Sequence, residues 1–232
     1  MAAVKNHLEE VVVFKMKVEI LRNEGNELAF SIEGISSAIA NTIRRVIIAE
    51  VPTLAIDEIT FVKNQTPFYD EIVALRFGLV PIKTDLNSYS TKEKGKTKAT
   101  TELQFKLKVK GPKMVYSGDL KSKDAKCIPV YDNIPIANLL EGKEMVLEAT
   151  AILSNGKEHM KFSPGICYYR NMPVKFKSLD DLRDDSYEIK DDSFIFFIES
   201  FGQLSCKEMF SVAMDVLDDK LSEFEKKIEK LK

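Results

Sequence analysis

The sequence is poor in the residues that build metal centres and disulfide frameworks. It holds three cysteines, Cys127, Cys167 and Cys206, which lie about forty residues apart and form no Cys-x-x-Cys pair. Only His7 and His159 add further ligands of the usual kind. Structural zinc and iron–sulfur sites draw on clustered cysteines. We therefore expect free, buried thiols in a reducing compartment, with neither zinc nor an iron–sulfur cluster bound.

Glycine is also scarce, with ten residues in 232. None of the glycine-rich phosphate cradles occurs, and the Gly-x-Ser-x-Gly and His-Glu-x-x-His motifs of hydrolases and metalloproteases are missing as well. No stretch brings together a nucleophile, a base and an oxyanion site. The sequence therefore predicts a protein without a catalytic centre of its own.

The sequence also lacks long apolar runs and an excess of basic residues. No apolar run is long enough to span a bilayer, and the amino-terminal residues lack the basic start and apolar stretch of a secretory signal. Hydrophobic residues make up 44% of the chain, enough for a core, and the formal net charge is −2. Proteins that depend on phosphate contacts usually carry a basic excess. We expect a cytoplasmic protein that makes no membrane contact and does not recognise nucleic acid sequence directly.

The strand patterns predict a mostly antiparallel α+β fold. Apolar and charged residues alternate over 14–20, which predicts a strand with one solvent-exposed face, and the alternation resumes over 28–32 after a turn at 23–26. Residues 193–200 are apolar on both faces and predict a buried strand. Further strands are predicted over 54–63, 103–109 and 145–153, and a short helix follows Pro67.

A helix is predicted between Ser36 and Pro52, because serine caps a helix and the residue before proline resists helical geometry. One face of it is apolar, whereas the opposite face carries long cations. Such cations are usually only solvated, but arginine also suits the carboxylates of a partner protein. The apolar face comprises Ile35, Ile39, Ile43, Val46 and Ile47, and the opposite face comprises Asn41, Arg44, Arg45 and Ile48.

The last helix has the clearest pattern. Ser205 and Glu208 have the spacing of a capping box. Apolar residues then recur in steps of four and three, as they do along a helix that packs against another helix. The helix either covers its own sheet or extends into an interface, and the length of the pattern favours the interface. The repeating residues are Phe210, Met214, Leu217, Leu221, Phe224, Ile228 and Leu231.

Two charged segments offer weaker alternatives. Lysines at 92, 94, 96 and 98 lie in a polar loop that is either solvated or phosphate-binding. Residues 180–192 hold six aspartates without calcium-loop spacing. We interpret both as solvated segments, with a nucleic-acid-binding module and an acidic metal enzyme as the alternatives that they leave open.

Five blocks of sequence resemble the alpha-like subunits of multisubunit RNA polymerases, and the archaeal D-type members in particular. They occur in the family's order along nearly the whole chain. The blocks are Asn41–Arg45, Ala49–Glu58, Asp70–Pro81, Gly156–Pro164 and Phe197–Gly202.

The resemblance implies an architecture and a role. Residues 1–51 and 157–232 would form a discontinuous dimerisation domain of a sheet and two helices, and residues 52–156 an inserted, mostly antiparallel β-rich domain. The chain would pair with a smaller, L-type subunit and form the platform on which the large catalytic subunits assemble. The metal-binding aspartates of the polymerase would lie in the largest subunit, and the small N- and P-type subunits would be further partners.

The resemblance also implies two sets of interface residues. The surface for the L-type subunit would comprise Ile39, Ile43, Ile47, Phe210, Met214, Leu217, Leu221 and Phe224. The surface that docks the second-largest subunit would comprise Asn41, Arg44, Arg45, Lys157, His159 and Lys161.

Three departures from relatives narrow this expectation. Residues 166–193 hold Cys167 alone, so the cysteine-rich ferredoxin-like insert of some archaeal members is missing. The inserted domain has Cys127 in place of the zinc-ligand set of some eukaryotic relatives. The chain ends at Lys232, so we expect no counterpart of the DNA-binding domain of bacterial members.

Overall fold

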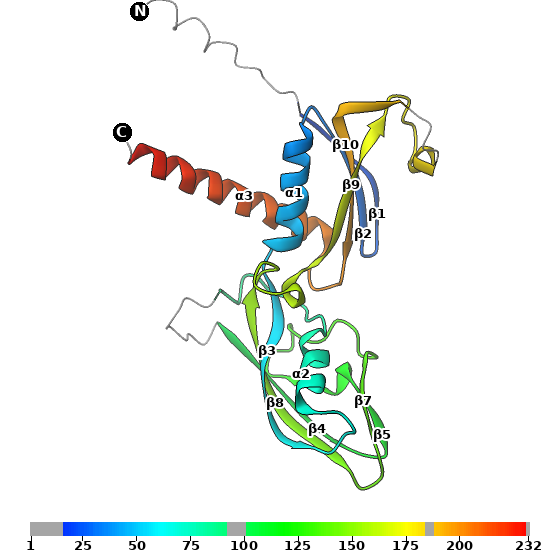
Figure 1. Cartoon of the computed structure of the whole chain (residues 1–232), viewed down its shortest axis with the longest axis vertical. Helices are drawn as coiled ribbons and strands as arrows, with labels where there is room; N and C mark the ends of the chain where they lie inside the picture. Colours follow the sequence, from blue (N-terminus) through cyan, green and yellow to red (C-terminus); the bar gives the residue numbers. More distant parts are fainter. Residues whose placement is uncertain (1–15, 92–100, 184–187, 231–232) are drawn as a thin grey trace, which may run out of the picture.

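The computed structural model describes residues 16–91, 101–183 and 188–230. Two four-stranded sheets lie one beyond the other along the long axis, as Figure 1 shows, and a long helix extends sideways from the upper one. The strands are β1 (Lys17–Glu24), β2 (Glu27–Glu33), β3 (Thr53–Asn64), β4 (Glu102–Lys110), β5 (Lys113–Tyr116), β6 (Lys121–Ser122), β7 (Pro135–Leu139), β8 (Glu144–Ser154), β9 (Gly165–Pro173) and β10 (Ile189–Ser200). The helices are α1 (Ser37–Ala49), α2 (Asp70–Gly78) and α3 (Cys206–Glu229), with short 3₁₀ turns η2 (Ser117–Asp119), η3 (Met160–Phe162) and η4 (Leu179–Arg183).

The upper sheet has the strand order β1-β2-β10-β9, with antiparallel neighbours throughout. Its central strands pair Phe196 with Phe30 on one side and with Tyr169 on the other, so these rings share the face that α1 and α3 cover. The Phe30 and Phe196 rings stack with centroids 5.2 Å apart, and Phe210 of α3 meets Phe30 edge-on at 4.9 Å. These aromatic contacts attach the start of α3 to the sheet.

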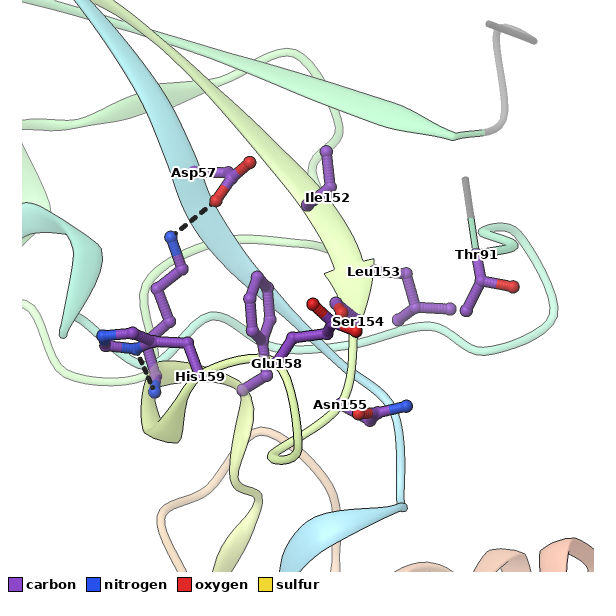
Figure 2. Close-up of a pocket in the computed structure, with 10 residues that line it drawn as sticks. Asp57, Thr91, Ile152, Leu153, Ser154, Asn155, Glu158 and His159 are labelled. Atoms are coloured by element: carbon purple, nitrogen blue, oxygen red, sulfur yellow. Dashed lines mark hydrogen bonds and ion pairs between the residues drawn. The ribbon is translucent and has the colours of Figure 1, made fainter. Parts of the chain in front are cut away.

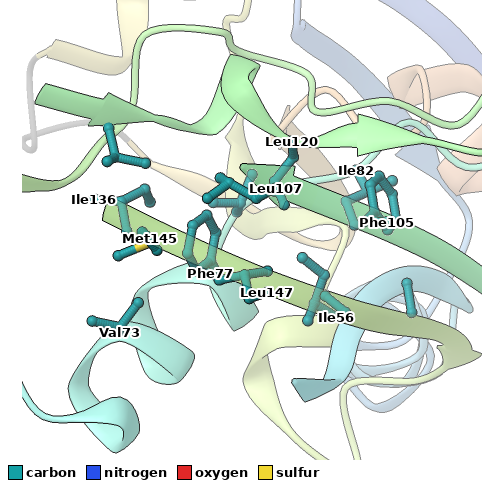
Figure 3. Close-up of a cluster of buried hydrophobic side chains, with 14 of the residues drawn as sticks. Ile56, Val73, Phe77, Ile82, Phe105, Leu107, Leu120, Ile136, Met145 and Leu147 are labelled. Carbon is teal, nitrogen blue, oxygen red and sulfur yellow. The ribbon is translucent and has the colours of Figure 1, made fainter. Parts of the chain in front are cut away.

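The lower part is built around the sheet β3-β8-β4-β6, beside the two-stranded sheet β5-β7. Alternating residues of β4 and β8 point into one core, and α2 contributes Val73 and Phe77 to it (Figure 3). The α+β class and the antiparallel pairing predicted from the sequence are confirmed.

The two parts have separate hydrophobic clusters and meet at the end of α1. There the Lys157 amide donates to the Ala49 carbonyl at 3.0 Å, and the Ser163 hydroxyl donates to the Ile48 carbonyl at 3.0 Å. Leu86 packs against both clusters. The domain boundaries after residues 51 and 156 stay a prediction.

The prediction of one buried face for the first strand is wrong for this chain on its own. Val18 and Ile20 on β1 are 52% and 56% exposed, and Met16 before the strand is exposed as well. They point to the helix side of the sheet, because Val18 pairs with Ile32 and Ile20 with Phe30. The two helices cover β2 and β10 but leave β1 bare. Residues 14 and 15, part of the same prediction, lie outside the described residues.

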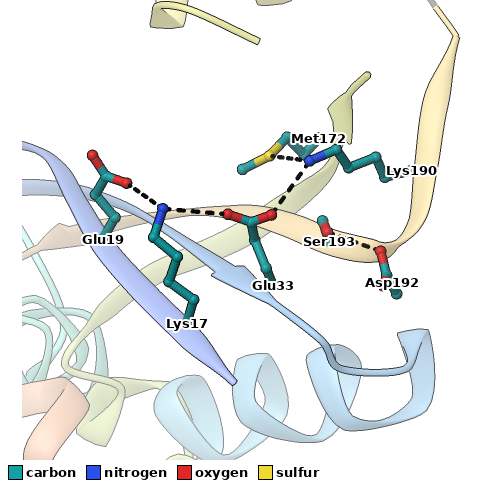
Figure 4. Close-up of polar contacts among 7 residues, drawn as sticks. All are labelled: Lys17, Glu19, Glu33, Met172, Lys190, Asp192 and Ser193. Atoms are coloured by element: carbon teal, nitrogen blue, oxygen red, sulfur yellow. Dashed lines mark hydrogen bonds and ion pairs between the residues drawn. The ribbon is translucent and has the colours of Figure 1, made fainter. Parts of the chain in front are cut away.

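The opposite face of the upper sheet carries charges at one end. Lys17 lies 3.2 Å from Glu19 and 3.7 Å from Glu33, and Lys190 lies 3.3 Å from Glu33 (Figure 4). Exposed pairs of this kind contribute at most about 1 kcal/mol each.

In the part of the chain that the structure describes, no helix is long and apolar enough to cross a membrane.

Candidate functional site: a protein interface built on two helices

The capping box predicted for the last helix is present. The Ser205 hydroxyl accepts from the Glu208 amide at 3.3 Å, while the Ser205 amide donates to the Glu208 carboxylate at 2.9 Å. The Ser205 hydroxyl also donates to the Glu208 carboxylate at 2.7 Å, and this bond, together with the one from the Ser205 amide, holds the pKa of Glu208 below its ordinary value. The cap fixes where α3 begins, and its first turns then bury Cys206, Met209 and Ala213 against the sheet.

The apolar repeat of α3 divides into a part that packs on this chain's own core and a part that is exposed. Phe210, Met214 and Leu217 are partly buried against the chain's own core. Beyond them, Leu221 and Phe224 are 59% and 62% exposed. Figure 1 shows the reason, since the outer half of α3 runs clear of the sheet. An amphipathic helix with a bare apolar stripe indicates a binding surface for another protein. Residue 231 of the repeat lies outside the described part of the chain.

Of the three α1 residues predicted to contact the L-type subunit, two are buried inside this chain and one is exposed. Ile43 and Ile47 are buried in the chain's own core, where a partner cannot touch them in this conformation, whereas Ile39 is exposed. Ser36 caps the helix as predicted, accepting from the Ile39 amide at 3.4 Å. That Ile43 and Ile47 belong to a partner interface stays a prediction, and their burial argues for an indirect, supporting part.

The cations expected to dock a large subunit mostly bind residues of this chain. Asn41 accepts from Arg44 at 2.9 and 3.2 Å along the same helix, and Lys157 lies 2.9 Å from Glu50. Arg45 is exposed and makes no hydrogen bond or ion pair with the described residues. It lies close enough to Lys157 that its like charge opposes the rise in the Lys157 pKa that the hydrogen bond to Glu50 causes. Arg45 is thus the cation of this set best placed to meet a partner's carboxylate.

The two remaining residues of that set lie at the junction of the two parts. Lys161 donates to Asp57 of β3 at 2.7 Å, and its amide donates to the His159 ring at 3.0 Å (Figure 2). These residues border an open pocket of about 750 Å³, which also includes Asn155 and Glu158. These two hydrogen bonds hold the η3 turn in place beside the end of α1. No sequence signal identified Asp57 or Glu50 as the residues that bind these lysines, because both pairings join segments far apart in the chain.

The structure describes only part of the acidic segment and none of the lysine loop. The lysine loop at 92–98 lies outside the described residues, as do Asp184 and Asp185. Asp181 accepts from the Lys177 and Ser178 amides at 2.7 and 2.9 Å, which lowers its pKa and gives it a local capping role. Asp191 and Asp192 lie in β10 rather than in a loop. Among the described residues, no group of three or more histidine, cysteine or acidic side chains is placed to hold a metal ion.

The three cysteines are free and buried. Burial raises the pKa of Cys127 to about 11 and that of Cys167 to about 12. Burial raises the pKa of Cys206 as well. Thiols held in the protonated form are poor nucleophiles and poor metal ligands.

The geometry therefore defines an assembly protein that presents a helical dimerisation surface. The family model described as the RNA polymerase Rpb3/Rpb11 dimerisation domain matches residues 29–221. This chain belongs to that family. It is an RNA polymerase assembly subunit that forms a heterodimer, and its dimerisation domain pairs with an L-type subunit.

Two individual relatives align over almost the full length of the chain, and a third aligns over about two thirds of it. DNA-directed RNA polymerase subunit Rpo3 of Pyrococcus horikoshii is 31% identical, with 93% of this chain and 99% of that protein aligned. The Rpo3 protein of Archaeoglobus fulgidus is also 31% identical, over 93% of this chain and 98% of that protein. The Rpo3 protein of Methanosarcina acetivorans is 39% identical, over 68% of this chain and 62% of that protein. Rpo3 is the D-type subunit, so the resemblance stated from the sequence is confirmed.

Proposed function

We propose that the chain acts without catalytic residues of its own, as the platform on which the large polymerase subunits assemble. The observation that carries this proposal is the bare apolar stripe of Leu221, Phe224 and Ile228 on the outer half of α3. Full burial of one Leu or Phe side chain is worth about 1.5–3 kcal/mol. Covering three of them supplies a large part of the free energy of a stable complex, after the costs of association are subtracted.

The L-type subunit covers this stripe in the proposed complex. Ile39 of α1 and the β1 residues Val18 and Ile20 are further exposed apolar side chains, and the two β1 residues lie on the helix side of the sheet. Ile43 and Ile47 are buried in the core cluster between α1 and the sheet, so they support α1 without contacting the partner. The partner belongs to the family that the matching model describes, so it presents helices of its own to this surface.

The second-largest subunit docks on the other side of α1, in the same proposal. Arg45 offers a free guanidinium there, and Asn41, Arg44, Lys157, His159 and Lys161 form the fixed surroundings. Arginine suits this use because its planar fork pairs with a carboxylate through two hydrogen bonds. The N- and P-type subunits are further proposed partners.

Several negative features complete the proposal. The chain works in the cytoplasm, binds neither an iron–sulfur cluster nor zinc, and recognises no nucleic acid sequence directly. The protonated, separated thiols support the absence of a metal centre, and the net charge of −2 supports the absence of a nucleic acid site.

Co-expression with the L-type subunit of the same genome tests the pairing. We expect a one-to-one complex by light scattering, and we expect Leu221→Glu to weaken it at least about tenfold, since central apolar anchors dominate such interfaces. The matched control is Val62→Glu, at an apolar position of β3 that is even more exposed. A monodisperse single chain that ignores the L-type subunit, or equal effects of both substitutions, would refute the proposal.

A further inference from the structure

The outer face of α2 carries a second bare apolar stripe, which the dimerisation surface does not explain. Leu75 and Leu79 are each 55% exposed, and Ile72 and Tyr69 are exposed beside them. Residues 72, 75 and 79 fall on one side of a helix. The buried side of the same helix is held by Val73 and Phe77 in the lower core. Bare stripes of this kind, rimmed by polar residues, mark interaction sites.

A groove runs along this stripe. It has a volume of about 380 Å³ and lies between α2 and β3, with Ile59, Ala74, Leu75 and Leu79 forming its apolar lining. Gly78, which is itself buried, also contributes to its wall. An apolar groove of this size takes one or two side chains of a partner rather than a whole helix.

The charges at the rim limit what the partner can be. Asp57 and Lys161 also line the groove, but they neutralise each other at 2.7 Å. Arg76 is turned away from it, over the Phe68 ring at 4.3 Å. Glu71 makes no ion pair with the described residues, so it leaves one uncompensated negative charge at the rim. A lysine or arginine beside the entering apolar residue would complement that charge.

We propose that the groove between α2 and β3 is a second docking site, which receives an apolar side chain from another polymerase subunit. That side chain lies on a segment with a neighbouring lysine or arginine, which pairs with Glu71. The site lies on the lower part of the chain, away from α3 (Figure 1), so the L-type subunit on the α3 stripe leaves it open. His159 and Lys161 border it, so it continues the surface at the end of α1. A subunit bound there would span both parts of the chain.

Photo-cross-linking in the reconstituted polymerase tests the proposal. Benzoylphenylalanine replaces Leu75 or Leu79, and in the control it replaces Leu140, which is similarly exposed but lies outside the groove. We expect Leu75 and Leu79 to give one intersubunit product, whose peptide carries an apolar residue close to a lysine or arginine. Cross-links no stronger than those at Leu140, or products with nucleic acid or with an acidic segment, would overturn the proposal.

Binding measurements give the second arm. We expect Leu75→Glu combined with Leu79→Glu to weaken retention of the cross-linked subunit at least about tenfold. Glu71→Lys should weaken retention and Glu71→Asp should preserve it, with the difference shrinking at high salt. All these side chains are exposed, so the fold and the pairing with the L-type subunit should persist, as circular dichroism and light scattering would show. Unchanged retention in both the double variant and Glu71→Lys would also overturn the proposal.

Discussion

The Lys157 ammonium lies 2.9 Å from the Glu50 carboxylate, and Lys220 of α3 binds the other oxygen of the same group. Glu50 follows the last residue of α1. One carboxylate therefore joins the end of α1, the entry to the η3 turn and the middle of α3. Partial burial on its own would raise the pKa of Glu50, but the hydrogen bonds from Lys220 and Lys157 outweigh it and hold the pKa below its ordinary value. This contact helps to set the direction in which α3 leaves the sheet.

Replacement of that carboxylate should loosen α3. We expect Glu50→Gln to lower the free energy of unfolding by about 1–2 kcal/mol, above the value for exposed ion pairs and below that for fully buried ones. We also expect the substitution to weaken binding of the L-type subunit, although residue 50 does not contact that subunit in the proposed complex. Thermal unfolding and titration calorimetry measure the two effects. Glu148→Gln is the matched control, since its pair with Lys106 at 2.6 Å is well exposed on both sides and should be worth almost nothing.

The same contact makes a signed prediction for pH. Because the folded-state pKa of Glu50 is depressed, its contribution to stability is present above the ordinary glutamate pKa and is lost as the pH falls through the folded value. The stability difference between the wild type and Glu50→Gln should therefore be constant near neutral pH and shrink below about pH 4. A difference that stays unchanged down to pH 3 would show that the ion pairs contribute nothing.

The bare face of β1 provides a separate test of the dimerisation surface. We expect Ile20→Glu to weaken binding of the L-type subunit at least about fivefold, since a carboxylate there would lose water on complex formation. Ile166→Glu serves as the control, because Ile166 is comparably exposed but lies on β9, next to the buried Cys167, and faces away from the helices. Binding isotherms that coincide for the two variants would remove β1 from the interface.

Local patterns were sufficient to predict the three helices and most of the longer strands, whereas β5, β6, β7 and β9 were not predicted. The cap at Ser205 and the alternation along β8 depend only on residues a few positions apart, and both were found where the sequence placed them. The boundaries of β3 also agreed to within a residue of the predicted range.

Tertiary placement decided what the sequence could not. The alternation in β1 correctly predicted a strand, but whether its apolar side is covered depends on how far α1 and α3 reach across the sheet. The bond that Arg44 donates to Asn41 was not foreseen from the sequence, and the docking role of Arg44 stays a prediction. The Leu75 and Leu79 stripe was missed because an apolar pattern in a short helix looks the same whether it faces a core or a partner.

Cysteine reactivity tests the expectation of free, inert thiols. With all three thiols buried and their pKa values raised, we expect no reaction with Ellman's reagent at pH 8 in the native protein, and three equivalents after denaturation. Elemental analysis of the same sample should show neither zinc nor iron at stoichiometric levels. Rapid labelling of a native thiol, or one bound metal per chain, would contradict this expectation.

The strand β9 meets its neighbour too closely for a side chain at its first residue. A Cβ at Gly165 would lie 2.1 Å from the Glu199 carbonyl oxygen and 3.1 Å from the Met209 methyl group beneath α3. We expect Gly165→Ala to destabilise the chain by about 1–3 kcal/mol, as overpacking does. At Gly78 the nearest atom is an ordinary 3.6 Å away, so Gly78→Ala should be neutral or stabilising by up to about 1 kcal/mol. Urea unfolding of the two variants in parallel gives the comparison.

The separate cores lead to a prediction about how the chain unfolds. Phe196 lies in the upper cluster and Phe77 in the lower one, and both are fully buried. If residues 52–156 form a domain of their own, calorimetry of the heterodimer should resolve two transitions. Each Phe→Ala substitution removes about 3–5 kcal/mol from its own core. For domains of about 100 residues that loss shifts the unfolding midpoint by roughly 10 °C or more, so Phe77→Ala should lower the midpoint of one transition and Phe196→Ala that of the other.

The contacts of Lys157 and Ser163 with the end of α1 oppose independent unfolding of the two parts. A single transition that both substitutions lower equally would mean that these contacts unite the two parts into one cooperative unit, and that the proposed domain boundaries are not boundaries of stability.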